Sequence, residues 1–271
     1  MITIFDILHK KTPMHTAIIT GAYGAIGQAI ARGVAAKGYH VTLAGRNEQA
    51  LEDFRKELAD ETGNSHISIM ALDLSQKHQI QAAAEKWSGP LHLLINNAAT
   101  TPPTRTETPQ GIEMQFATNV LGYFWMTRYF SEYMKGLDDA RIVNVASYWA
   151  GDLDLNDLEF KKRHYDNDTV YRQSKQANRM LTVAFAGKLK KHGISVLSAH
   201  PGDVRSKLSN QLGHGGWESP EEGADTPLYC ALEPGLKGIT GKYFAHRQEE
   251  PCPFSTNQDE VERLYEICAM Y

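Results

Sequence analysis

The sequence has few cysteines and no histidine pairs that suit a metal ion. Cys230, Cys252 and Cys268 are the only cysteines in 271 residues, and none belongs to a Cys-x-x-Cys pair. An odd number of scattered cysteines predicts free thiols in a reducing compartment, so we expect a cytoplasmic protein. No two of the 11 histidines stand three or four residues apart, so no helix can present two of them to a metal. We therefore expect no metal site.

An excess of basic charge and a long apolar run are also lacking. The 28 Lys and Arg residues are outnumbered by 32 Asp and Glu residues, giving a net charge of −4. This balance argues against a nucleic-acid partner. No stretch approaches the roughly 18 apolar residues of a membrane-spanning helix, so no stable membrane span is expected. Residues 1–13 predict an N-terminal tail, and Met14, directly before the first expected strand, is an alternative start to Met1.

What the chain does contain is an alternation of short apolar runs and longer amphipathic stretches. We expect about seven strands, at 15–20, 39–44, 66–72, 91–95, 141–146, 195–199 and 241–244. Between them we expect helices, at 26–37, 49–61, 76–87, 113–134, 171–191 and 221–232. Apolar strands without polar alternation predict a parallel sheet covered by helices on both faces. This pattern indicates one doubly wound α/β domain over 14–271, whose ligands bind beyond the carboxyl ends of the strands.

A glycine-rich turn follows the first expected strand. It reads Gly21-Ala22-Tyr23-Gly24-Ala25-Ile26-Gly27 and leads into the first expected helix. Glycines let the backbone approach a diphosphate, which then lies against the free N–H groups at the helix N-terminus. This position predicts a nucleotide-binding turn of a Rossmann fold. The alternative is a plain structural turn.

The end of the second expected strand bears on the choice of nucleotide. Sites for NAD usually carry Asp or Glu about 20 residues beyond the glycines. Here Arg46 and Asn47 stand in that place, with no carboxylate before Glu48. An arginine can pair with a 2′-phosphate, whereas an acid repels it, so we expect NADP(H) rather than NAD(H). The alternative is a solvated arginine at the start of a helix.

Polar residues follow later strands as well. Ser147 comes after the fifth expected strand, and Tyr171 and Lys175 open the next helix, four residues apart on one helix face. A nearby ammonium favours phenolate over phenol, so we expect Lys175 to lower the pKa of Tyr171.

Together these motifs resemble the short-chain dehydrogenases/reductases over nearly the whole chain. The resemblance includes the glycine turn, Asp73, the Asn96-Asn97-Ala98-Ala99 motif, Asn119, Ser147, the Tyr171 and Lys175 pair, and His200-Pro201-Gly202. Residues 118–124, 171–178 and 241–244 are most similar to the retinol-dehydrogenase-like branch.

The resemblance implies an oxidoreductase that interconverts an alcohol and a carbonyl by hydride transfer. Tyr171 would be the general acid or base, and Ser147 would hydrogen-bond the reacting oxygen. Lys175 would assist Tyr171 and hold the nicotinamide ribose, and Asn119 would position a water for proton supply. The alternative for Asn119 is a residue that caps or kinks its helix. The implied cofactor contacts are Gly21, Tyr23, Gly24, Ala25, Ile26, Gly27, Arg46, Asn47, Asp73, Leu74, Asn97, Ala98, Ala99, Tyr171, Lys175, Pro201, Gly202, Val204 and Ser206.

The chain departs from the family pattern in three places. Ala25 replaces the middle glycine of the turn, and Ala99 replaces the last glycine of its motif. The distance from Ser147 to Tyr171 is longer than the family core requires, which predicts an insertion at 152–168 that loops over one side of the site.

The substrate side is expected to combine this insertion with a lid at 207–220. Tyr148, Trp149 and Trp217 predict aromatic walls and hence a fairly apolar alcohol or carbonyl substrate. The alternative for Trp217 is simple packing in a surface loop. An apolar face on the helix from Glu113 would build a homodimer or homotetramer. The alternative function is a non-catalytic NADP(H)-sensing binding protein with the same fold.

Overall fold

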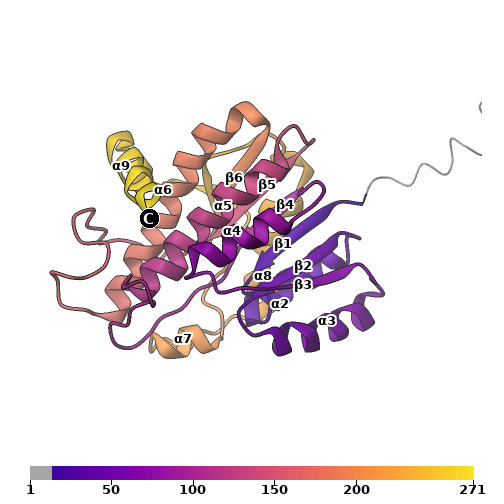
Figure 1. Ribbon diagram of the computed structural model, residues 1–271, viewed down its shortest axis with the longest axis horizontal. Coiled ribbons are helices and arrows are strands. Elements are labelled where there is room, and N and C mark those ends of the chain that lie inside the picture. Colours follow the sequence, from indigo (N-terminus) through magenta and orange to yellow (C-terminus); the bar gives the residue numbers. More distant parts are fainter. Residues whose placement is uncertain (1–13) are drawn as a thin grey trace, which may run out of the picture.

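The computed structural model describes residues 14–271, so the predicted tail at 1–13 lies outside the described residues. Eight strands form one sheet in the order β3-β2-β1-β4-β5-β6-β7-β8, and every neighbouring pair is parallel except β7 and β8 (Figure 1). The strands are β1 Thr16–Thr20, β2 His40–Gly45, β3 Ile67–Ala71, β4 Leu93–Asn96, β5 Ala140–Val145, β6 Ile194–Ala199, β7 Lys242–Ala245 and β8 Gln248–Glu250. The doubly wound α/β class is therefore confirmed.

The helices form a layer on each face of the sheet. The main helices are α2 Ala25–Ala35, α3 Glu48–Thr62, α4 Lys77–Lys86, α5 Gly122–Phe130, α6 Asn167–Leu189, α7 Lys207–Gln211, α8 Pro220–Leu232 and α9 Gln258–Met270. Side chains of α2, α3 and α8 pack in one apolar cluster, and those of α4, α5, α6 and α9 pack in the other. The sheet separates the two clusters, as a parallel sheet with two buried faces requires.

Two predicted elements differ from the structure. The sheet has an eighth strand, β8, whose three residues are exposed and carry no apolar signal. The helix expected at 113–134 begins as a π-helical segment, η1 Phe116–Leu121, continues as α5, and ends in a 3₁₀ turn, η2 Ser131–Met134. Its apolar residues are not left exposed, because nearly all of α5 is buried within the chain itself.

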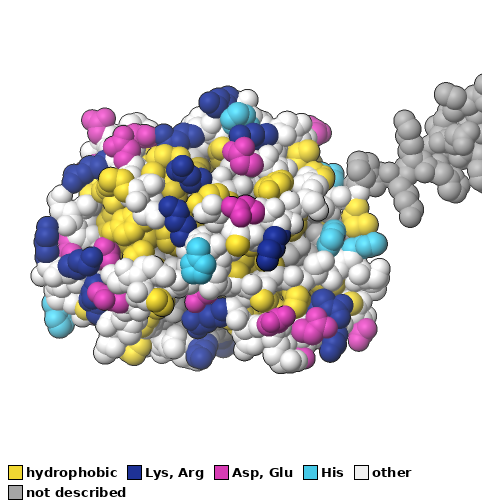
Figure 2. Space-filling model, viewed as in Figure 1, with side chains coloured by type: hydrophobic (Ala, Val, Ile, Leu, Met, Phe, Trp, Pro, Cys, Tyr) yellow, Lys and Arg dark blue, Asp and Glu magenta, His cyan; other side chains and the backbone are white. Residues whose placement is uncertain are grey.

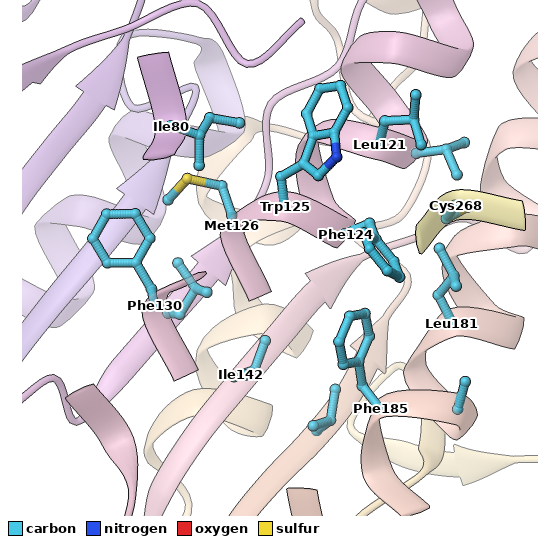
Figure 3. Close-up of a cluster of buried hydrophobic side chains, with 14 of the residues drawn as sticks. Ile80, Leu121, Phe124, Trp125, Met126, Phe130, Ile142, Leu181, Phe185 and Cys268 are labelled. Carbon is cyan, nitrogen blue, oxygen red and sulfur yellow. The ribbon is translucent and has the colours of Figure 1, made fainter. Parts of the chain in front are cut away.

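The C-terminal helix packs against part of that apolar surface. Tyr265 of α9 packs edge-on against Phe124 of α5 and Phe185 of α6, with ring centroids 5.1 and 5.2 Å away. Cys268 faces the same cluster, as Figure 3 shows. The face expected to join two copies of the chain is therefore occupied by α9, and a homodimer or homotetramer remains a prediction.

The surface carries mixed charge. On the face drawn in Figure 2, basic and acidic side chains alternate, and hydrophobic side chains gather beside the C-terminus. None of the helices within residues 14–271 is both long enough and apolar enough to span a bilayer. Cys230, Cys252 and Cys268 are all free thiols.

Candidate active site

A cavity of about 360 Å³ lies beyond the carboxyl ends of the strands. Its volume is in the range of small-molecule sites. Among the residues expected to bind a cofactor, the cavity is lined by Gly21, Tyr23, Gly24, Ala25, Ile26, Gly27, Arg46, Asp73, Leu74, Asn97, Ala98, Ala99, Tyr171, Lys175, Pro201 and Ser206. The fold therefore brings most of the predicted site residues to one place.

The glycine turn has the close backbone packing expected of a phosphate cradle. Gly21 has φ +65°, and a Cβ there would lie 2.7 Å from Cα of Ala98. A Cβ on Gly27 would overlap the carbonyl oxygen of Gly21 and approach Nδ2 of Asn97 to 2.9 Å. Only glycine fits these two positions. Ala25, the departure from the family pattern, is the first residue of α2, so its methyl is accommodated.

The N-terminus of α2 suits an anion. Gly24 is the N-cap and offers no side chain to the free N–H groups, and the first turn of α2 contains no acidic residue. These N–H groups and the positive end of the helix dipole favour a phosphate group. The cradle therefore fits a dinucleotide.

Arg46 stands at the edge of this cradle with its side chain exposed. Among the ion pairs within residues 14–271, none includes Arg46, so its guanidinium is available to a ligand. Asn47 does not line the cavity. Its side chain accepts the N–H of Ala50 at 3.1 Å and caps α3, so the structure gives this predicted cofactor contact a structural role.

Tyr171 and Lys175 lie one turn apart on α6 and both line the cavity. Nζ of Lys175 donates to the carbonyl oxygen of Val145 at 2.8 Å and lies 5.5 Å from the centre of the Tyr171 ring. Lys175 is only 2% exposed, and this burial lowers its pKa to about 7.

The pKa of Tyr171 shifts in the direction opposite to our expectation. Burial raises it well above its ordinary value, and the hydroxyl of Ser147 opposes that rise by hydrogen bonding. Asp203 and Asp168 raise it further through their negative charge. The predicted lowering by Lys175 is wrong for this structure, because desolvation of the phenol dominates and Lys175 is itself a weakened cation.

Asn119 lies in η1, where the helix widens. Its side chain accepts the N–H of Thr100 at 2.8 Å, donates to the carbonyl of Thr100 at 3.0 Å, and reaches Oγ of Ser174 at 3.3 Å. It does not line the cavity. Asn119 thus fastens the loop after β4 to α6, and its role in holding a water remains a prediction.

The segment after β6 behaves differently from expectation at three residues. Gly202 and Val204 do not line the cavity: Gly202 has φ +88° against the Glu218 carboxylate, and Val204 is buried beneath Gly216. Ser206 does line the cavity, but its hydroxyl accepts the N–H of Ser209 at 3.0 Å and caps α7. These contacts hold the lid segment in place.

The predicted aromatic wall lies outside the cavity. The hydroxyl of Tyr148 donates to Asp203 at 3.3 Å, and Trp149 packs against His214 with ring centroids 3.9 Å apart. Trp217 is 71% exposed.

The insertion at 152–168 is an ordered segment organised by one carboxylate. Asp157 is 5% exposed and accepts the backbone N–H groups of Lys161, Lys162 and Arg163. Its far end contacts a cavity-lining residue, because Nδ2 of Asn167 donates to the carbonyl of Gln211 at 3.4 Å. Its middle contacts the C-terminal segment, where Arg263 donates to Asn156 and the hydroxyl of Tyr271 donates to Glu159. No residue of 152–168 lines the cavity, so the insertion covers less of the site than we expected.

The sequence predicted a lid at 207–220 but not the helix α7 within it, nor that this helix lines the cavity. Lys207, Leu208 and Gln211 all line the cavity, and so do Thr100 and Thr118. Oε1 of Gln211 accepts the hydroxyl of Thr101 at 3.3 Å, and its carbonyl accepts Nδ2 of Asn167 at 3.4 Å. The signal available was the Ser206-x-x-Ser209 spacing, which is typical of a helix cap.

Comparison with known proteins decides the family. The family model described as short chain dehydrogenase matches residues 15–216, which is most of the chain. The chain belongs to the short-chain dehydrogenase family. Retinol dehydrogenase 11 of Mus musculus is 35% identical over 252 residues, covering 88% of this chain and 79% of that protein. Retinol dehydrogenase 12 of Homo sapiens is 34% identical over 272 residues, covering 95% and 86%.

These relatives confirm the predicted resemblance to the retinol-dehydrogenase-like branch. Among solved structures, an uncharacterised protein from Mycobacterium paratuberculosis superposes with a TM-score of 0.78 at 25% identity, covering 94% of this chain and 93% of that chain. This short-chain dehydrogenase is therefore an oxidoreductase that acts between alcohols and carbonyls of small molecules, with NAD(P)(H) as the family's cofactor.

Proposed function

We propose that the protein is an NADP(H)-dependent oxidoreductase that interconverts an alcohol and a carbonyl on a fairly apolar small molecule. The observation that carries this proposal is that Tyr171 and Lys175 line the same cavity as the glycine turn. The nicotinamide of the cofactor, when bound, supplies or accepts the hydride. Every other part of the reaction falls to the side chains of this chain.

Tyr171 is the group that moves the proton. Its hydroxyl donates to the carbonyl oxygen during reduction and accepts from the alcohol during oxidation. Because its pKa is raised by burial, Tyr171 is protonated and ready to donate at neutral pH. We propose that Ser147, whose hydroxyl accepts the N–H of Trp149 at 3.0 Å and does not itself line the cavity, binds the reacting oxygen and stabilises the charge that develops there.

Lys175 supports Tyr171 from the interior. The bond from its ammonium to the carbonyl of Val145 fixes its position between β5 and α6. We propose that it holds the ribose hydroxyls of the nicotinamide half and draws protons toward Tyr171. Asn119 hydrogen-bonds both Thr100 and Ser174 and so holds the loop after β4 against α6.

The preference for NADP(H) rests on Arg46. It lines the cavity with its side chain exposed, and no acidic residue stands beside it at the end of β2. A guanidinium suits a 2′-phosphate through paired hydrogen bonds, each worth about 1.5–3 kcal/mol when charged. A cytoplasmic location remains our prediction from the sequence.

The test follows NADPH and NADH absorbance with a panel of aldehydes, ketones and alcohols. Tyr171→Phe should reduce turnover by about 10²–10⁴-fold and leave NADPH binding intact, because only the proton donor is removed. Retained turnover would exclude Tyr171 as the acid. Wild-type protein that binds NADPH but reacts with no member of the panel would favour the sensing protein instead.

Cofactor preference is tested by Arg46→Ala. It should weaken NADPH binding by about tenfold or more and leave NADH binding unchanged, because only NADPH carries the 2′-phosphate. Arg128→Ala is the matched control, since it removes an exposed arginine from α5 that does not line the cavity. An equal loss for both cofactors would contradict the assignment of Arg46.

A further inference from the structure

Three basic side chains line the cavity, and two of them already have a role. Arg46 stands at the end of β2, beside the adenosine end of the proposed dinucleotide. Lys175 is buried and bonded to the carbonyl of Val145. Lys207 is the third, and nothing in the proposed reaction uses it. Its side chain is exposed, and no carboxylate within residues 14–271 lies within ion-pair distance of its ammonium.

The backbone of Lys207 is held firmly at the cavity wall. It is the first residue of α7, directly after the cap in which Ser206 and Ser209 exchange hydrogen bonds at 3.0 and 2.9 Å. At the other end of α7, Oε1 of Gln211 accepts the hydroxyl of Thr101, and the carbonyl of Gln211 accepts Nδ2 of Asn167. Hydrogen bonds therefore hold α7 at both ends, and Lys207 lines the cavity from this helix.

The negative charge of a dinucleotide's diphosphate is only partly balanced by the N-terminus of α2, so an additional cation such as Lys207 would stabilise it. The diphosphate carries about two negative charges, whereas a helix N-terminus such as that of α2 offers the equivalent of about half a positive charge. The glycine turn contributes only N–H groups, and Asp73 is the one acidic residue lining the cavity among those the structure describes. Lys207 on α7 offers a second source of positive charge at the same cavity.

We propose that Lys207 binds the diphosphate of the dinucleotide from the α7 side, so that the cofactor is clamped between the glycine turn and α7. The proposal rests on the proposed function, since it needs a dinucleotide in the cavity. It also gives Lys207 and Arg46 separable roles. Lys207 acts on the diphosphate that NADP(H) and NAD(H) share, and Arg46 acts on the 2′-phosphate that only NADP(H) carries.

The test measures dissociation constants of three ligands by titration calorimetry: NADPH, NADH and adenosine 2′-monophosphate, which lacks the diphosphate. Lys207→Met should weaken NADPH and NADH by the same factor, about 5–20-fold, as expected for one exposed charge-assisted contact. It should leave adenosine 2′-monophosphate unchanged, and Lys207→Arg should restore most of the affinity. Arg46→Ala should instead weaken NADPH and adenosine 2′-monophosphate and leave NADH unchanged.

Arg205→Met is the matched control, because it removes one positive charge two residues earlier from a side chain that does not line the cavity. The proposal is overturned if Lys207→Met changes dinucleotide affinity by less than about twofold, or by no more than Arg205→Met does. It is also overturned if adenosine 2′-monophosphate is weakened equally. Wild-type protein that binds neither dinucleotide would instead refute the proposed function itself.

Discussion

Replacing Glu113 with glutamine should change how the stability of the protein depends on pH. Glu113 is fully buried just before η1, and burial raises the pKa of its carboxyl group from the usual 4.5 to about 7. The N–H groups of Gln115 and Phe116 donate to this carboxyl at 2.9 and 2.6 Å and oppose the rise. Arg105 opposes it and Glu159 adds to it through their charges.

The size and sign of the effect follow from this pKa. Between pH 4.5 and about pH 7 the folded protein holds a proton on Glu113 that the unfolded chain releases. The contribution to the free energy of unfolding is therefore complete below pH 4.5 and is lost as the pH rises through about 7. At about 1.4 kcal/mol for each pH unit, the loss amounts to about 3 kcal/mol.

Urea unfolding at several pH values from about 4.5 to 8 measures this contribution. The free energy of unfolding of the wild type, taken relative to Glu113→Gln, should fall by about 3 kcal/mol across that interval, because glutamine does not titrate. Glu266→Gln, which removes an exposed carboxylate of α9, is the control. Parallel curves for the wild type and Glu113→Gln would refute the reasoning.

Three further predictions concern the cradle, the insertion and Trp217. Gly27→Ala should cost about 1–3 kcal/mol and weaken dinucleotide binding, whereas Gly24→Ala, whose Cβ would lie 3.3 Å from the Gly21 carbonyl oxygen, should be milder. Equal losses in denaturant titrations would contradict the cradle. Asp157→Ala should destabilise the protein by about 3 kcal/mol, because three backbone N–H groups lose their acceptor. Hydrogen exchange at 161–163 should accelerate, and unchanged protection would argue against this role. Trp217→Ala should alter stability by less than about 0.5 kcal/mol, because the ring is exposed, yet raise the KM for substrate while leaving NADPH affinity unchanged. Unchanged kinetics would assign Trp217 to surface packing alone.

The strands illustrate which parts of the fold were predictable. The seven expected strands are apolar runs of four to seven residues, and each occurs in the sheet, because burial on both faces requires such runs. The strand Gln248–Glu250 is polar and exposed, so it forms only because the edge of β7 offers it hydrogen-bond partners. Likewise α6 begins at Asn167, four residues earlier than expected, because Asp166 caps it through the N–H of Thr169.

In the site, too, some features were predictable from the sequence and others depended on the tertiary structure. The spacing of Tyr171 and Lys175 placed them on one helix face, and the structure brings them to one cavity. Their pKa values depend on burial, which spacing does not report, so the expected lowering of the Tyr171 pKa was wrong. Asn47, Gly202 and Val204 lie close in sequence to residues that line the cavity but do not line it themselves. Asn47 caps α3, and Gly202 and Val204 pack against Glu218 and Gly216.

By itself the sequence determined the parallel α/β class, the glycine turn and the residues that follow the strands, because these depend on local periodicity and on the sterics of single residues. The tertiary structure alone decided how deeply Tyr171, Lys175 and Glu113 are buried, that α9 covers the apolar face of α5 and α6, and that α7 brings Lys207 to the cavity. Desolvation and packing depend on which segments far apart in the chain come together, and no local pattern encodes that.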